Sequence, residues 1–260
     1  MDLQLQNKVI VVSGGAKGIG EGISLILARE GAQVVILGRN EKDNNHLVER
    51  IVNNGGKAIG IKAELSVPEQ CADAIAKTVE VFGRIDGLVN NAGVNDGVGL
   101  ENGTYEGFVK SLHSNLIHYF LLAHHCLPYL IKSKGSIVNI GSKTADTGQG
   151  GTSAYAAANG GRNALTREWS VELLKYGIRV NAVIVAECYT PLYESWISTF
   201  ENPEAKLKSI TNNIPLGKRF TTQEEIANSV AFLLSDCSSH TTGQLIYVDG
   251  GYVHLDRALN

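Results

Sequence analysis

The most informative chemical pattern is a run of glycines near the N-terminus. Gly14, Gly18 and Gly20 follow an apolar run in the spacing G-x3-G-x-G, and a helix is expected to begin inside this motif. One glycine allows a tight turn, another lets the backbone approach a pyrophosphate, and the helix N-terminus supplies oriented N–H donors. A glycine turn between a strand and a helix can also be purely structural. The position of the motif after the first expected strand favours dinucleotide binding.

A second motif, Asn90-Asn91-Ala92-Gly93, ends the fourth expected strand. Read alone, it could be a simple turn, because Asn and Gly favour such positions. Together with the glycine spacing, it resembles the short-chain dehydrogenase/reductase family, and the resemblance extends along nearly the whole chain. It implies a Rossmann fold that binds a nicotinamide dinucleotide. On this resemblance, the expected cofactor-binding residues are Gly14, Lys17, Gly18, Ile19, Arg39, Glu64, Leu65, Asn91, Ala92, Gly93, Tyr155, Asn159, Cys188 and Thr190.

The spacing of Ser142 and Tyr155, with twelve residues between them, also matches this family. The resemblance implies that Tyr155 exchanges a proton with the substrate oxygen while the Ser142 hydroxyl holds that oxygen. It also implies that Asn115 supports a water-linked proton path. Hydride transfer to or from a carbinol carbon requires such a proton shuttle beside the nicotinamide. Read singly, each residue could be an ordinary polar side chain, and an isolated tyrosine is more often a packed amphipathic one.

Asn159 departs from the family pattern Tyr-x-x-x-Lys. A lysine one helical turn from the tyrosine would stabilise the ionised phenol and bind the nicotinamide ribose, whereas an asparagine can do only the second. We therefore expect Asn159 to hold the ribose and Asn159→Lys to raise turnover near neutral pH. A competing hypothesis is a catalytically impaired dinucleotide-binding protein that acts as a sensor or assembly partner. Arg162 could supply part of the missing charge, or could face solvent or a subunit.

The end of the second expected strand bears on the choice of dinucleotide. NAD-preferring relatives carry an acid there, but this chain has Gly38 followed by Arg39. With Lys17 in the glycine loop, Arg39 suits a 2′-phosphate, which favours NADP and leaves NAD possible. The alternative is a solvated surface arginine. Glu64-Leu65 stands where relatives have an acidic residue that touches adenine.

The segment after the sixth expected strand bears on the substrate. Thr190 matches a family threonine that contacts the nicotinamide carboxamide, although the usual Pro-Gly before it is absent. The sequence from Thr190 to Trp196, that from Ile214 to Phe220 and the ending from His254 to Leu259 resemble bacterial sugar dehydrogenases of the L-fucose type. Gln149, Glu187 and Trp196 would suit a polyol, since amide and carboxylate bind hydroxyls and an aromatic face covers C–H groups. Equally, Trp196 could pack within a lid and Glu187 could be solvated.

These residues need a scaffold that alternates strands and helices. Apolar runs predict seven buried strands, at Val9–Val12, Val34–Leu37, Ala58–Ile61, Ile85–Val89, Ser136–Ile140, Ile178–Ile184 and Leu245–Val248. Helical periods predict helices at Gly18–Glu30, Pro68–Phe82, Tyr105–Ile131, Ser153–Leu174 and Gln223–Leu234. This alternation indicates an α/β fold, a doubly wound parallel sheet with helices on both faces. We expect one domain over residues 1–260, with a substrate-lid insertion around 188–219.

Composition narrows the class of partner. The net charge of -3 offers no broad basic surface for nucleic acid, so a small-molecule substrate is expected. No apolar run is long enough to span a membrane, and the N-terminus lacks the pattern of a signal peptide, which predicts a cytoplasmic protein. Four dispersed cysteines, and histidines that lack a metal-binding spacing even where His124 and His125 are adjacent, predict no metal site. The apolar surfaces of the two long helices, like the family resemblance, predict a homotetramer or at least a homodimer. The sequence thus predicts an NAD(P)-dependent oxidoreductase that acts on a secondary alcohol, a carbonyl or a sugar.

Overall fold

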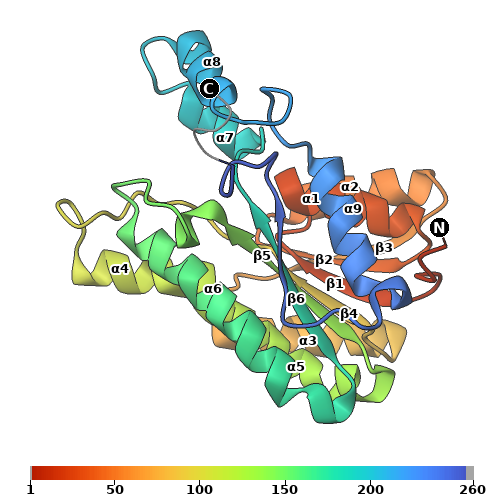
Figure 1. The fold of residues 1–260 in the computed structure, drawn as a ribbon. Helices are drawn as coiled ribbons and strands as arrows, with labels where there is room; N and C mark the ends of the chain where they lie inside the picture. Colours follow the sequence, from red (N-terminus) through yellow and green to blue (C-terminus); the bar gives the residue numbers. More distant parts are fainter. Residues whose placement is uncertain (1, 256–260) are drawn as a thin grey trace.

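The computed structural model describes residues 2–255 and contains a seven-stranded, fully parallel sheet (Figure 1). The strand order is β3-β2-β1-β4-β5-β6-β7, which confirms the expected doubly wound fold. The strands are β1 (Val9–Ser13), β2 (Gln33–Gly38), β3 (Lys57–Lys62), β4 (Gly87–Asn90), β5 (Ser136–Ser142), β6 (Arg179–Val185) and β7 (Leu245–Val248). The order reverses between β1 and β4, and ligands of such sheets bind in the crevice beyond the carboxyl ends at this point.

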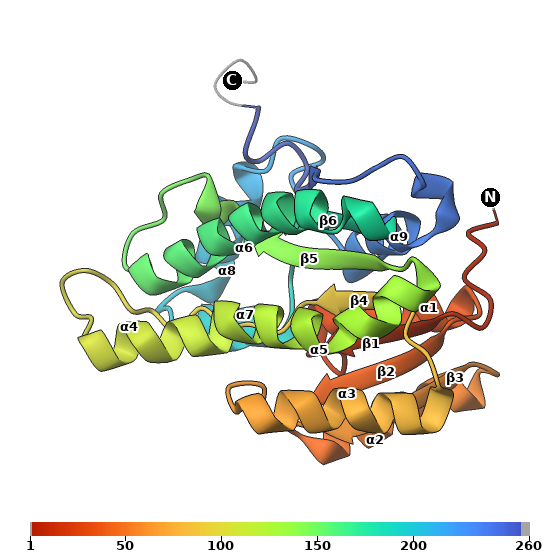
Figure 2. The same cartoon turned by 90° about the horizontal axis from the view of Figure 1, so that it is seen from below.

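Helices cover both faces of the sheet. They are α1 (Gly18–Arg29), α2 (Glu41–Asn53), α3 (Pro68–Phe82), α4 (Tyr105–Leu112), α5 (His118–Ser133), α6 (Ser153–Glu172), α7 (Pro191–Ile197), α8 (Pro203–Asn212) and α9 (Gln223–Leu234). One apolar core joins the sheet to α1, α2 and α9, and a second joins it to α3, α5 and α6. Figure 2 looks onto the second of these layers. Strand β1 lies between the two cores and contributes side chains to both, and its five residues are all buried.

The expected long helix over Tyr105–Ile131 is interrupted in the structure. Between α4 and α5 lies a π-helical turn, η1 (His113–Ile117), in which Asn115 is fully buried. A π-turn shifts the backbone hydrogen-bond pattern by one residue, and such turns occur frequently at functional sites. Hydrophobic spacing does not detect it, since the apolar residues continue on both sides of the turn.

Helix α2 was not expected, because its sequence is dominated by polar residues. Only Asn44, Leu47 and Ile51 are buried along its thirteen residues. Its start is nevertheless encoded locally, since the Asn40 side chain accepts hydrogen bonds from the backbone of Lys42 and Asp43.

The segment expected as a lid contains α7 and α8, which project beyond the sheet in Figure 1. Its two ends meet, because an isolated β-bridge pairs Cys188 with Thr221. Residues 256–259 of the sugar-dehydrogenase-like ending lie outside the described part of the chain. None of the described helices is long and apolar enough to cross a membrane.

Candidate active site

A cleft of about 630 Å³ lies at the carboxyl ends of the strands. It holds most of the site residues expected from the sequence. Those in its lining are Gly14, Lys17, Gly18, Ile19, Arg39, Glu64, Leu65, Asn91, Ala92, Gly93, Ser142, Tyr155, Cys188 and Thr190. Asn115, Gln149, Asn159, Glu187 and Trp196 are outside this lining. The glycine loop and the Ser142–Tyr155 pair therefore belong to one site, although more than 120 residues separate them in the sequence.

The glycine loop is locked against the end of β4. The Asn91 amide donates to the carbonyl oxygens of Ser13 and Gly14, at 2.9 and 3.2 Å. Gly14 has a positive φ of 61°, and a Cβ there would approach the Ala92 Cα to 3.0 Å. No side chain caps the N-terminus of α1, whose first residues line the cleft. Uncapped helical N–H groups beside a close-approach glycine fit the pyrophosphate of a dinucleotide.

The two cations expected at the adenosine end of the cleft are both near carboxylates. Lys17 Nζ lies 2.7 Å from Asp43, and an Arg39 nitrogen lies 3.9 Å from Glu64. Both basic side chains are more than half exposed. Exposed pairs of this kind contribute about 0–1 kcal/mol, so a doubly charged phosphate could displace the carboxylates.

Gly38 has a steric reason to lack a side chain. A Cβ at this position would come within 2.6 Å of Asn44 Oδ1. The buried Asn44 amide in turn donates to the carbonyl oxygens of Gly38 and Ile61, which ties α2 to the ends of β2 and β3. An acid of the NAD-binding type therefore cannot be placed at Gly38 unless Asn44 moves.

Ser142 ends β5, and Tyr155 lies in the first turn of α6. Both side chains are half-buried and line the same cleft. Ser142 Oγ lies 3.1 Å from Thr144 Oγ1, which fixes the serine hydroxyl at the start of a short 3-10 turn. A phenol and a hydroxyl at the edge of one cleft can hold a substrate oxygen and exchange its proton.

Asn115 and Asn159 lie beneath the cleft, and both are fully buried. Asn115 Oδ1 accepts a hydrogen bond from the backbone of Val94, at 2.7 Å. The Asn159 amide donates to the carbonyl of Tyr155, at 2.9 Å, and its Oδ1 accepts from Arg162, at 3.1 Å. Because both ends of the Asn159 amide are already engaged inside the protein, the expectation that it holds the ribose finds no support in this geometry.

Two buried side chains that can carry charge, Arg162 and His118, also line the cleft; the sequence pointed to Arg162 only as a possible source of charge and did not point to His118. Arg162 is 3% exposed, and His118 is 1% exposed. Burial, with a smaller contribution from the Arg162 charge, lowers the His118 pKa to about 3, so the imidazole is neutral at physiological pH. Periodicity would have assigned the His118 side chain to ordinary helix packing.

This buried histidine predicts a pH dependence of stability. The folded-state pKa of His118, about 3, is below its ordinary value of 6.5. As the pH falls between these values, the unfolded chain takes up a proton that the folded protein excludes. The free energy of unfolding therefore falls by up to about 1.4 kcal/mol per pH unit from this group. We expect His118→Gln to remove this part of the slope in urea unfolding measured from pH 7 to 4. His46→Gln, at an exposed position, should retain it, and equal slopes in both variants would contradict the assignment.

The residues expected to bind substrate do not line the cleft. Glu187 forms an ion pair with Lys143, and both side chains are nearly buried. The hydroxyl of Tyr193 is buried next to Glu187, and this burial raises the Tyr193 pKa. Trp196 is 42% exposed and packs edge-on against Tyr193, with ring centroids 5.2 Å apart. Gln149 is exposed. Glu187 and Trp196 are thus joined through Tyr193 in one polar and aromatic cluster.

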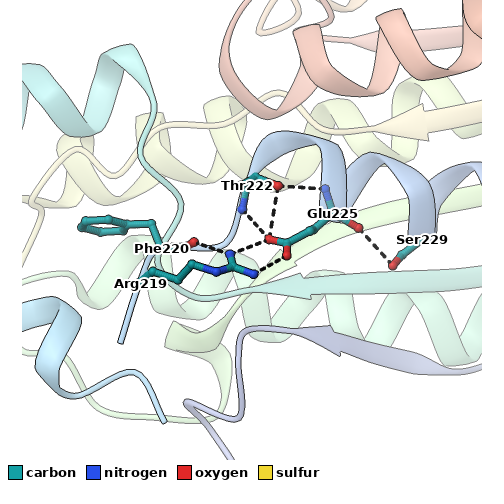
Figure 3. Close-up of polar contacts among 5 residues, drawn as sticks. All are labelled: Arg219, Phe220, Thr222, Glu225 and Ser229. Atoms are coloured by element: carbon teal, nitrogen blue, oxygen red, sulfur yellow. Dashed lines mark hydrogen bonds and ion pairs between the residues drawn. The ribbon is translucent and has the colours of Figure 1, made fainter. Parts of the chain in front are cut away.

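The end of the lid segment is fixed to α9 (Figure 3). Arg219 makes two hydrogen bonds to Glu225, at 2.9 and 2.5 Å, and the Glu225 carboxylate also accepts from the backbone of Thr222. The Arg219 guanidinium, followed by the Thr222 amide, lowers the Glu225 pKa to about 2. Thr222 and Glu225 complete a capping box. The C-terminal end of the 188–219 segment is therefore anchored to the N-terminus of α9.

The described cleft residues include neither an ionised thiol nor a metal-ligand cluster. Burial raises the Cys188 pKa to about 12, so its thiol stays protonated. Within residues 2–255, no group of three His, Cys, Asp or Glu side chains could hold a metal ion.

Known proteins resemble this chain over almost its full length. A family model described as enoyl-(acyl carrier protein) reductase matches residues 14–253. A 3-oxoacyl-acyl-carrier-protein reductase, FabG of Thermotoga maritima, is 36% identical and aligns over 96% of this chain and 100% of its own. An L-fucose dehydrogenase of Oryctolagus cuniculus is 34% identical over 94% of this chain and 84% of its own. The crystal structure of Cj0485 dehydrogenase has a TM-score of 0.94 and 46% identity, covering 100% of this chain and 99% of that one.

Proposed function

The chain belongs to the short-chain dehydrogenase/reductase family of oxidoreductases, and from this premise we propose that it oxidises a hydroxyl-rich secondary alcohol, a sugar, with NADP. The observation that supports this most strongly is one cleft containing the glycine loop, Ser142 and Tyr155. The uncapped start of α1 would hold the pyrophosphate. A bound dinucleotide would supply the hydride acceptor. Ser142 would hold the substrate oxygen, and Tyr155 would take its proton.

The proposed substrate class rests on the cluster around the lid. Lys143 and Glu187 form a nearly buried ion pair beside the hydroxyl of Tyr193, and Trp196 adds an aromatic face. Charged and hydroxyl groups suit the hydroxyls of a sugar, and aromatic rings suit its C–H surfaces. The L-fucose dehydrogenases among the relatives point to an aldose that is oxidised at its hemiacetal carbon. We propose that the segment 188–219 closes over this substrate.

The test is dinucleotide reduction by the purified chain. L-fucose, other aldoses and cyclohexanol would each be offered with NADP and with NAD, and reduced nicotinamide would be followed by absorbance. We expect turnover with at least one aldose. If every substrate fails in a single-turnover assay while the dinucleotide still binds, the competing hypothesis of a non-catalytic sensor replaces this proposal.

We expect NADP to bind several-fold more tightly than NAD. Arg39 and Lys17 can pair with a 2′-phosphate once their carboxylate partners are displaced. Arg39→Ala should weaken NADP binding about 10-fold, the effect of losing one charge-assisted hydrogen bond, and leave NAD binding unchanged. Asp43→Asn should strengthen NADP binding, because it releases Lys17.

Calorimetric titration of both dinucleotides measures these affinities. Arg29→Ala is the matched control, since Arg29 also forms an exposed ion pair but lies at the far end of α1. Equal affinities for NADP and NAD, or no effect of Arg39→Ala, would show that Arg39 does not bind the 2′-phosphate.

We also expect a homotetramer or a homodimer. Large apolar side chains are exposed on the long helices, among them Phe120 in α5 (51%) and Val171 in α6 (68%). We propose that these side chains contribute to contiguous apolar surface, which on a folded protein marks an interaction site. Light scattering at micromolar concentration should give the mass of at least two chains, and Phe120→Glu should lower it. A monomeric wild-type protein would refute this expectation.

A further inference from the structure

Arg162 is a buried charge with no carboxylate partner. Its guanidinium donates to the carbonyl of Asn115 (Nε, 2.6 Å), to the carbonyl of Ile140 (3.1 Å) and to Asn159 Oδ1 (3.1 Å). It also lies over the ring of Tyr119, 4.3 Å from the centroid. None of the ion pairs within residues 2–255 includes it. Each nitrogen of the guanidinium has a hydrogen-bond acceptor, but no carboxylate of the described residues neutralises the charge.

Neighbouring residues fix the position of the Arg162 guanidinium at the cleft. The guanidinium donates a hydrogen bond to the backbone carbonyl of Asn115, which lies in the π-helical turn η1. A Cβ on Gly93 would come within 2.7 Å of an Arg162 nitrogen, so a glycine is needed there. Side chains at positions i, i+4 and i+7 share one face of a helix, which aligns Tyr155, Asn159 and Arg162 along α6. Arginine side chains in helices lean toward the N-terminus, which here is the end that carries Tyr155.

The charged and titratable groups around Arg162 leave one acid that can respond to it. From α5, His118 has a pKa lowered by burial and stays neutral, while burial raises the pKa of Tyr119 and keeps its phenol protonated. From β5 and η1 the contacts include backbone carbonyls. On α6 itself, Tyr155 lines the same cleft as Arg162. A buried cation without a counter-charge is costly, and it stabilises a negative charge that forms nearby.

We propose that Arg162 is the cation that stabilises the ionised form of Tyr155, and that Asn159 positions it. This inference rests on the proposed role of Tyr155 as the acid/base. During alcohol oxidation, ionised Tyr155 takes the proton of the substrate hydroxyl as the carbinol hydride passes to the dinucleotide. The C–H electron pair leaves with the hydride, the O–H electrons form the new C=O bond, and Tyr155 ends as a neutral phenol. Arg162 offsets the negative charge that Tyr155 carries before this step.

The test compares Arg162→Gln with Arg162→Lys, because both retain a hydrogen-bond donor but only lysine retains the charge. Tyr155 ionisation would be followed without cofactor or substrate, by NMR of ζ-carbon-labelled tyrosine, with Tyr155→Phe assigning the signal. In the wild type, Tyr155 should ionise below the pH at which a free tyrosine does, about 10. Arg162→Gln should move this ionisation up by about one pH unit or more, and Arg162→Lys should move it much less. Arg167→Met is the control, since Arg167 is exposed on the same helix.

Activity provides a second readout. With the proposed substrate, Arg162→Gln should lose about 10-fold or more of kcat at neutral pH and recover activity at higher pH. A wild-type Tyr155 that ionises like free tyrosine, or equal shifts in the Gln and Lys variants, would overturn the inference. If both variants fail to fold, the wild-type titration still tests the inference, because ionisation of Tyr155 like that of free tyrosine overturns it. Because that titration needs no substrate, it also separates this inference from the substrate proposal.

Discussion

Tyr155→Phe is expected to abolish hydride transfer while dinucleotide binding persists. The substitution removes one hydroxyl from a half-buried ring in the first turn of α6 and leaves the glycine loop and the start of α1 unchanged. Two other titratable groups of the cleft cannot replace this phenol, since the low pKa of His118, about 3, makes its imidazole a weak base and burial keeps the Cys188 thiol protonated. General acid–base catalysis contributes about 10²–10⁴-fold, so we expect kcat to fall by about 10³-fold, the middle of this range.

Stopped-flow measurement of a single turnover, together with calorimetric titration of NADP, would test this expectation. Tyr105→Phe is the matched control, since Tyr105 is 78% exposed at the start of α4 and should retain full activity. Ser142→Ala should lose less, about 10²-fold, because Ser142 orients the substrate oxygen but does not take the proton. If Tyr155→Phe retains more than a tenth of the wild-type rate, the proton passes through another group.

Asn159→Lys is expected to destabilise the protein and to lower turnover. This reverses the expectation from the sequence, which treated position 159 as a site for a missing cation. In the structure Asn159 is fully buried, and its Oδ1 is hydrogen-bonded to the guanidinium of Arg162. A lysine there would bury a second cation against the first, and an uncompensated buried charge costs about 3–5 kcal/mol. Urea unfolding should show a loss of at least about 3 kcal/mol.

The double substitution Asn159→Lys with Arg162→Leu should recover most of the stability and the turnover, because a single cation then remains. Asn159→Asp is the matched variant, since it gives Arg162 a carboxylate partner without a large change in volume. It should leave the protein folded and stable but lower kcat near neutral pH, because the carboxylate offsets the charge that Tyr155 would use. If Asn159→Lys raises turnover in a stable protein, position 159 accepts a cation and Arg162 does not occupy its place.

Much of the scaffold could be predicted because its signals are local. Each of the seven expected strands corresponds to a strand of the sheet, although Ile85 and Asp86 precede β4 rather than belong to it. Buried parallel strands require continuous apolar runs, and this requirement is visible in the sequence whatever the neighbouring elements are. The interrupted helix at η1 and the polar helix α2 escaped detection, because neither changes the apolar spacing in a recognisable way.

The cleft was predictable for a related reason. The glycine loop, Asn91 and Arg39 lie directly after strands, and the carboxyl ends of parallel strands meet at one edge of the sheet. Once the strands are assigned, residues that follow them are brought together by topology alone. The sequence by itself therefore determined the fold class, the dinucleotide cleft and the pairing of Ser142 with Tyr155.

Only the tertiary structure decided how the charges are distributed. Side chains from different elements form the ion pairs of Lys17 with Asp43 and of Lys143 with Glu187. They also determine that Arg162 has no carboxylate partner among residues 2–255. Sequence spacing places Arg162 on the face of Tyr155 and Asn159, but it does not show whether that face is covered. Here η1, Gly93 and Tyr119 cover it and leave a buried, unneutralised guanidinium beside the cleft. Electrostatic effects depend on distance and on burial, and both are set by the packing of elements that are far apart along the chain.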